Sequence, residues 1–128
     1  MPAAKPGRDE YLLRAEDNAL FAEHIANHND QRFFGWAITA LFYAAAMYGR
    51  AYLKSKGVAW QPTHDGFTYS FARTCSNRRL FRHYEKMRCR SESTRYDCVN
   101  TALPDIATVR NVHFTPFRDG VLRLISRP

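Results

Sequence analysis

The stretch FFGWAITALFYAAAMYGRAYL, residues 33–53, distributes apolar side chains around every face of a helix. A helix that is apolar on all faces is buried on all faces. The uncharged run 33–49 is short for a membrane span and carries several polar groups, so we expect a buried helix and a cytoplasmic protein without membrane contact. We place this helix between about Gln31 and Lys56, after a break and N-cap at Asn29-Asp30.

Helical patterns continue on both sides of this stretch, and no segment shows the strict alternation of a strand. Apolar residues three and four apart predict a helix over 9–28, whereas the segment 1–8 shows no such pattern and is expected to be a disordered tail. Further helices are expected through Phe67 and Phe71 with Thr63 or Asp65 as the cap, over 77–88 and over 91–100. A last helix is expected from Pro104 onward, with a break or kink near Thr115 caused by Pro116.

These patterns predict one all-α domain over residues 9–128, folded as a bundle of four or five helices. A chain of 128 residues has scarcely enough other elements to cover the long apolar helix completely. A second copy of the chain would supply the missing cover, so we expect a homodimer.

The positive charge of the chain is concentrated in one segment. The formal net charge is +7, and residues 73–95 alone carry almost all of it. This density favours a polyanion such as RNA or a nucleotide, because arginine makes bidentate and stacked contacts with phosphates and bases. An acidic protein surface is the alternative partner. The candidate nucleic-acid-binding residues are Arg73, Arg78, Arg79, Arg82, Lys86, Arg88 and Arg90.

Two arginine–histidine pairs are the candidate catalytic groups. Arg78 precedes His83 by five positions, and Arg110 precedes His113 by three. A histidine can move the proton of a ribose 2′-hydroxyl while an arginine stabilises the charge that develops on the phosphate, so such a pair can cleave RNA without a metal. Both spacings also arise by chance in a chain this rich in arginine, so a structural role for each pair is the alternative.

The cysteines and histidines show no metal-site pattern. The three cysteines contain no Cys-x-x-Cys pair, which also argues against a disulfide framework. His24 and His28 are four residues apart and could face one ion on a helix, but no third ligand accompanies them. We therefore expect no metal and no cofactor, and a metal enzyme built on these two histidines is the weakest alternative.

Two blocks of the sequence resemble small prokaryotic HEPN-like proteins. The first is the stretch from Trp36 to Leu53, followed by Gly57 and Thr63-His64, and the second is Tyr84 with the segment 91–96. The resemblance implies an up-and-down helical bundle, often a homodimer packed through its long helices. Many such proteins are metal-independent ribonucleases in toxin–antitoxin or antiphage systems, with an arginine and a histidine separated by four to six residues.

The ribonuclease signature of that family is degenerate in this chain. The pair Arg78 and His83 has the right spacing but precedes the second block, whereas Arg110 lies late in the chain but too close to His113. We expect a HEPN-like homodimer that binds RNA or nucleotides through residues 73–95, with or without ribonuclease activity. A non-catalytic interaction module, antitoxin-like or phage-encoded, is the alternative. Under the first hypothesis a polar cluster near the loop end of the long helix is formed by Tyr43, His64, Arg95 and Tyr96.

Overall fold

The computed structural model describes residues 6–28 and 30–126, and every regular element in this part of the chain is helical. The all-α class predicted from the sequence is confirmed. Residues 1–5 of the expected tail lie outside the described residues, and Arg8 already begins the first helix. The elements are α1 (Arg8–Asn27), the 3₁₀ turn η1 (Gln31–Phe33), α2 (Phe34–Ser55), α3 (His64–Thr74), α4 (Arg78–Tyr96), α5 (Leu103–Thr108), the π-helical segment η2 (Val109–Phe114) and α6 (Thr115–Ser126).

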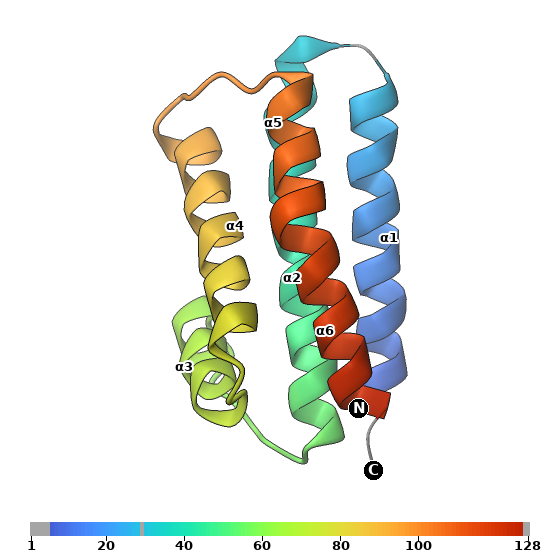
Figure 1. Cartoon of the computed structure of the whole chain (residues 1–128), viewed down its shortest axis with the longest axis vertical. Helices are drawn as coiled ribbons and strands as arrows, with labels where there is room; N and C mark the ends of the chain where they lie inside the picture. The colour runs from blue at the N-terminus through green and yellow to red at the C-terminus, as the bar shows by residue number, and fades with distance from the viewer. Residues whose placement is uncertain (1–5, 29, 127–128) are drawn as a thin grey trace, which may run out of the picture.

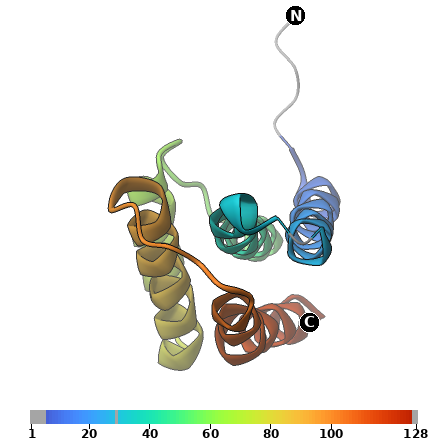
Figure 2. The same cartoon turned by 90° about the horizontal axis from the view of Figure 1, so that it is seen from above.

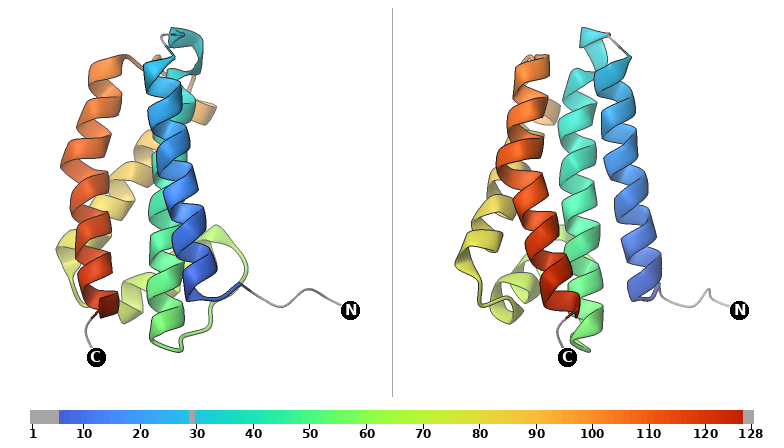
Figure 3. Two further views of the ribbon diagram at one scale, coloured as in Figure 1. Left: turned by 90° about the vertical axis from the view of Figure 1, so that its right-hand side faces the viewer. Right: turned by 45° about the vertical axis from the view of Figure 1, so that its right-hand side comes forward.

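The long helices lie side by side, and the chain direction alternates from one to the next (Figure 1). The segments α5, η2 and α6 follow one another as one continuous rod, and the short α3 lies beside the lower end of α4 (Figure 1). Seen from above, α2 lies between α1, α4 and this rod (Figure 2). The side views show α1 running along α2 for most of its length (Figure 3).

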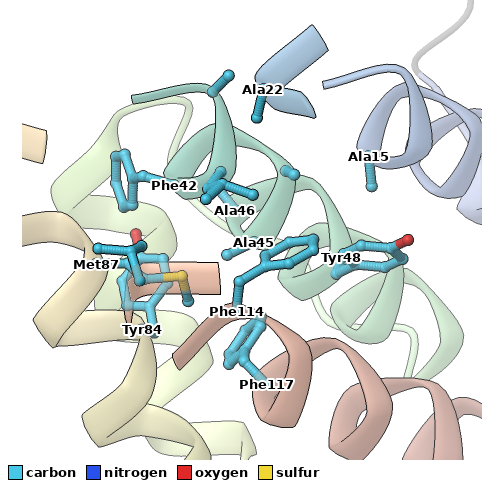
Figure 4. Packing of buried hydrophobic residues seen from close by; sticks show 14 of the residues in the cluster. Ala15, Ala22, Phe42, Ala45, Ala46, Tyr48, Tyr84, Met87, Phe114 and Phe117 are labelled. Atoms are coloured by element: carbon cyan, nitrogen blue, oxygen red, sulfur yellow. The ribbon is translucent and has the colours of Figure 1, made fainter. Parts of the chain in front are cut away.

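The apolar helix α2 is covered by its own chain. Most of its 22 residues are buried against α1, α3, α4 and α6. The expectation that one chain is too short to cover this helix is therefore wrong. Alanine supplies the physical reason, because Ala15 and Ala22 of α1 are fully buried and let the two helices approach closely (Figure 4). The homodimer that this expectation supported stays a prediction.

An aromatic core holds α2, α3, α4 and α6 together. The Tyr84 ring lies 5.5 Å from that of Phe42, 5.8 Å from that of Phe67 and 6.1 Å from that of Phe117, measured between centroids. Figure 4 shows Tyr84 and Phe117 in this cluster with Phe42 of α2. The Tyr84 hydroxyl lies 3.1 Å from Thr68 Oγ1, so its polar atom is satisfied although the residue is fully buried.

Side-chain caps start three helical segments, and two of them, Asp30 and Thr63, are residues expected as caps from the sequence. Asp30 Oδ1 accepts a hydrogen bond from the backbone N–H of Arg32 at 3.1 Å, and Thr63 Oγ1 accepts one from Gly66 at 2.9 Å. Asn77 Oδ1 accepts two at the start of α4. Each cap satisfies backbone donors that have no partner in the first turn. Asn29, the other half of the expected break, lies outside the described residues.

The helix α4 is continuous where the sequence pattern suggests two pieces, and it ends at Tyr96 rather than at residue 100. Ser91 lies at the start of the second expected piece, where it is fully buried and donates a hydrogen bond to Thr39 Oγ1 of α2 at 3.2 Å. This contact fixes the middle of α4 against α2. Residues 97–102 then form the loop that leads to α5.

Pro116 does not interrupt the last helix, so the break that was one of the two outcomes expected near Thr115 is wrong. A proline lacks an N–H group, and its ring crowds the carbonyl four residues earlier. The π-helical segment η2 precedes it, and the N–H of Thr115 donates to the carbonyl of Arg110, five residues back. This wider turn accommodates the proline without interrupting the rod. His113 lies within η2, and π-helical turns occur frequently at functional sites.

Candidate functional site

A pair of histidines joins α4 to η2. Nδ1 of His83 lies 3.1 Å from Nδ1 of His113, and the two ring centroids are 5.3 Å apart. These residues come from the two separate arginine–histidine pairs of the sequence, 30 positions apart. Both side chains are half-buried. The structure therefore joins the two candidate histidines to each other.

The arginines of those two pairs are placed differently. Arg110 turns toward α1, where its Nη1 lies 2.8 Å from Glu23 Oε1. Its charge is therefore engaged in an ion pair and is not available to a phosphate beside His113. Arg78 is the exposed first residue of α4, and the cations that act on His83 are its neighbours Arg79 and Arg82.

The contact between the two rings fixes complementary tautomers. A neutral imidazole carries one N–H donor and one acceptor nitrogen, so one Nδ1 donates and the other accepts. The donating ring then has a free lone pair on Nε2, and the accepting ring carries a proton on Nε2. The neutral pair thus presents one base and one hydrogen-bond donor at the same time.

The surroundings of the pair favour its neutral form. Burial lowers the pKa of His83, and the nearby charges of Arg79 and Arg82 lower it further. Burial also lowers the pKa of His113, with additional contributions from His83, Lys86 and Arg90. Protonation of both rings would place two cations in contact on a surface that is already positive. At neutral pH the pair is therefore uncharged and able to accept a proton.

The candidate nucleic-acid-binding residues separate into engaged and free cations. Arg88 pairs with Glu85 at 2.7 Å and with Glu92 at 3.2 Å, and these carboxylates hold its pKa above the ordinary value. Arg90 lies 3.4 Å from Asp105. Arg73 donates a hydrogen bond to the hydroxyl of Tyr69 of α3. Within residues 6–28 and 30–126, the members of the set without a carboxylate partner are Arg73, Arg78, Arg79, Arg82 and Lys86.

Three of the free cations share a face with the histidine pair. Arg79, Arg82 and Lys86 are spaced three and four residues apart around His83, so they project from neighbouring positions on α4. Next to them, a groove of ≈ 350 Å³ between α4 and α6 is lined by Arg79, His83 and Arg123. Its acidic residue is Asp119, which pairs with Arg118 at 3.1 Å. The groove and this face form one predominantly positive surface, which we call the α4 cation face (Arg79, Arg82, His83 and Lys86).

The residues of the predicted polar cluster come together near the end of α4. They lie beside the first half of α2, so the expected position at the loop end of the long helix is wrong. Arg95 Nη1 donates a hydrogen bond to the Tyr43 hydroxyl at 3.2 Å, and its guanidinium lies over the Tyr96 ring at 5.0 Å. The Tyr43 and His64 rings are stacked with centroids 6.3 Å apart. Burial lowers the pKa of His64, and the charges of Arg50 and Arg95 lower it further.

Two features of these sites were not indicated by the sequence. The first is the contact between His83 and His113, because nothing in the local pattern relates residues on two separate helical segments. The second is Arg50, whose guanidinium lies 4.8 Å over the Phe67 ring. Burial lowers the pKa of Arg50. The sequence feature that could have drawn attention to Arg50 is that it is the one charged residue within 33–53.

Three comparisons with known proteins bring no further information on the site. Neither protein-family models, nor curated proteins, nor solved structures match this chain. Among the described residues, no group of three or more histidine, cysteine, aspartate or glutamate side chains could hold a metal ion. In the same part of the chain, every helix is too short or too polar to cross a membrane.

Proposed function

We propose that this protein binds RNA on the α4 cation face and cleaves it without a metal, with His83 and His113 as the proton-transfer pair. The observation that carries the proposal is the 3.1 Å contact between the two Nδ1 atoms, beside cations that have no carboxylate partner in the described residues. Two histidines in contact supply both a base and an acid, which are the groups that cleavage next to a 2′-hydroxyl requires.

The proton transfers balance within the pair. Nε2 of the donating ring takes the proton of the 2′-hydroxyl, and the 2′-oxygen forms a bond to phosphorus. The Nδ1 proton of that ring passes to Nδ1 of its partner. The partner's Nε2 proton goes to the 5′-oxygen as its bond to phosphorus breaks. The products are a 2′,3′-cyclic phosphate and a 5′-hydroxyl, and the two rings end with exchanged tautomers.

The free cations have two roles in this proposal. Arg79, Arg82 and Lys86 attract the phosphate backbone, which makes binding dependent on salt. A guanidinium close to the reacting phosphate also stabilises the negative charge that develops there. Arg82 and Arg79 are suited to this role because their charges already act on His83.

The proposal includes the HEPN-like, up-and-down arrangement of the bundle and its assembly as a homodimer. Support for a second copy comes from the outer face of α1, where Leu13 is 61% and Leu20 is 68% exposed. These residues are seven positions apart and lie on one face. We expect Leu13→Ser/Leu20→Ser to convert the dimer into a monomer in sedimentation equilibrium. A wild-type chain that sediments as a monomer would contradict this part of the proposal.

Incubation of the purified protein with single-stranded RNA and excess EDTA tests the activity. We expect cleavage that leaves 2′,3′-cyclic phosphate ends, and no cleavage of the same sequence with 2′-deoxy sugars. His83→Asn and His113→Asn should each slow cleavage by about 10²–10⁴-fold, the usual contribution of general acid–base catalysis. His24→Asn is the matched control, because His24 is an exposed histidine on α1. RNA that stays intact with the wild-type protein refutes the catalytic proposal.

A further inference from the structure

A second groove lies at the C-terminal end of α4, whereas the α4 cation face begins near the N-terminal end of this helix. Its volume is ≈ 560 Å³, within the range of small-molecule sites, and it opens between the start of α2 and the end of α4. Arg95 of this groove lies twelve residues after His83 on α4. The two side chains therefore leave the helix in directions about 120° apart. The groove is therefore separate from the histidine pair. The side chains that matter here are Arg32, Trp36, Arg95, Tyr96, Asn100 and Thr101.

Two exposed aromatic rings line this groove. Trp36 is 56% exposed and Tyr96 is 71% exposed. Neither side chain is needed by the core, which is built from other aromatic residues. Exposed aromatic rings in a polar groove are the usual platforms on which unpaired bases stack, since every base offers a π-face.

A positioned cation accompanies the two rings. Arg95 donates hydrogen bonds to the Tyr43 hydroxyl at 3.2 Å and to the carbonyl of Ser91 at 3.3 Å, and its guanidinium lies over Tyr96. None of these partners carries a negative charge, so the positive charge of Arg95 is held in place without being neutralised. Arg32, by contrast, is engaged in a bidentate pair with Asp30. Arg95 is therefore the group in this groove that suits a phosphate.

Uncharged polar groups complete the lining. The amide of Asn100 and the hydroxyls of Thr94 and Thr101 can both donate and accept hydrogen bonds. Such groups match the edges of unpaired bases. A duplex does not offer the Watson–Crick edges or the ring faces, because its bases are paired with each other and stacked.

We propose that this groove binds one nucleotide of single-stranded RNA, with its base against Trp36 and Tyr96 and its phosphate on Arg95. The inference rests on the proposed RNA binding and adds a place where the strand is held away from the histidine pair. Stacking is tolerant of base identity, so the groove provides a preference for single strands rather than for one sequence.

Binding of a 2′-O-methyl oligoadenylate of about ten residues, which cannot be cleaved, tests the groove by fluorescence anisotropy. We expect Trp36→Ala and Tyr96→Ala each to weaken binding of the single strand by about 5- to 100-fold. Binding of the same strand in a duplex should not change in either variant. Tyr96→Phe keeps the ring and should bind like the wild type. Phe21→Ala is the control with matched exposure, since Phe21 of α1 is 55% exposed and lies outside the groove.

The outcomes separate this inference from the proposed function. Unchanged single-strand affinity in both Trp36→Ala and Tyr96→Ala overturns the groove and leaves RNA binding on the α4 cation face intact. Failure of the wild-type protein to bind the strand at all overturns both. Competition by adenosine monophosphate distinguishes a free nucleotide from a strand as the source of the bound group.

Discussion

Acid should destabilise this protein through the contact between His83 and His113. The pKa of each ring is lowered in the folded state, from an ordinary value of 6.5. The folded protein then binds fewer protons than the unfolded chain around and below that pH. The neutral pair therefore makes its full contribution to the free energy of unfolding above about pH 6.5, and this contribution falls as the pH decreases below that value.

The distance between the rings sets the size of the effect. Two charges delocalised over rings whose centroids are 5.3 Å apart repel by about 3 kcal/mol at an effective dielectric constant of about 20, and by about 1 kcal/mol in bulk water. The pair is half-buried, so the repulsion lies between these values. His113→Asn removes one of the two charges. A repulsion of this size keeps the second ring neutral, and one histidine loses at most about 2 kcal/mol between its ordinary pKa of 6.5 and pH 5. The loss of unfolding free energy between about pH 7.5 and pH 5 should therefore be about 1–2 kcal/mol smaller in this variant than in the wild type.

Urea unfolding followed by far-ultraviolet circular dichroism at both pH values measures this difference. Carboxylates that titrate in the same range contribute equally to the two proteins and cancel. The charges of Arg79, Arg82, Lys86 and Arg90 also act on the pair, and they oppose protonation in the same direction. Equal losses in the wild type and in His113→Asn would refute the contact as the source of the effect.

The remaining predictions concern the core and the cation face. Ser91→Ala should lower the free energy of unfolding by about 1–3 kcal/mol, because it leaves a buried threonine hydroxyl of α2 without its partner; urea unfolding checks this. Gly49→Ala should lower the free energy of unfolding by about 1–2 kcal/mol in the same assay. The new Cβ would stand 2.6 Å from a ring carbon of the buried Phe67, and the cost of this overpacking outweighs the gain in helix propensity. Arg82→Ala should reduce the slope of log affinity for RNA against log salt by about 1, whereas Arg88→Ala should leave it unchanged because two carboxylates already hold that charge; salt titrations compare the two.

The sequence predicted the helical class and most helix boundaries because those depend on local patterns. The apolar run at 33–53 and the capping residues Asp30, Thr63 and Asn77 each act within a few residues of their own position. The contact of Ser91 with Thr39, which holds the middle of α4 against α2, was not predictable, since the two residues are 52 positions apart. The same holds for the burial of α2, where alanines of α1 provide cover that composition alone does not reveal.

The candidate site was only partly predictable for the same reason. Local charge identified α4 as the basic element, and both histidines were nominated individually. Which cations are free depends on carboxylates placed by the fold, as the pairing of Arg110 with Glu23 across 87 positions shows. The contact between the two histidines likewise joins α4 to the π-helical segment that precedes Pro116, 30 positions along the chain. Long-range placement of this kind leaves no trace in residue spacing.

In the mechanism that we propose, His83 and His113 act as one proton-transfer unit, and the rate of RNA cleavage in a double-variant series tests this. Residues that act as a unit show strongly non-additive effects. We predict that His83→Asn/His113→Asn cleaves no more slowly than the slower single variant under single-turnover conditions in EDTA. Losses that multiply in the double variant, or single variants as fast as the wild type, would contradict the claim.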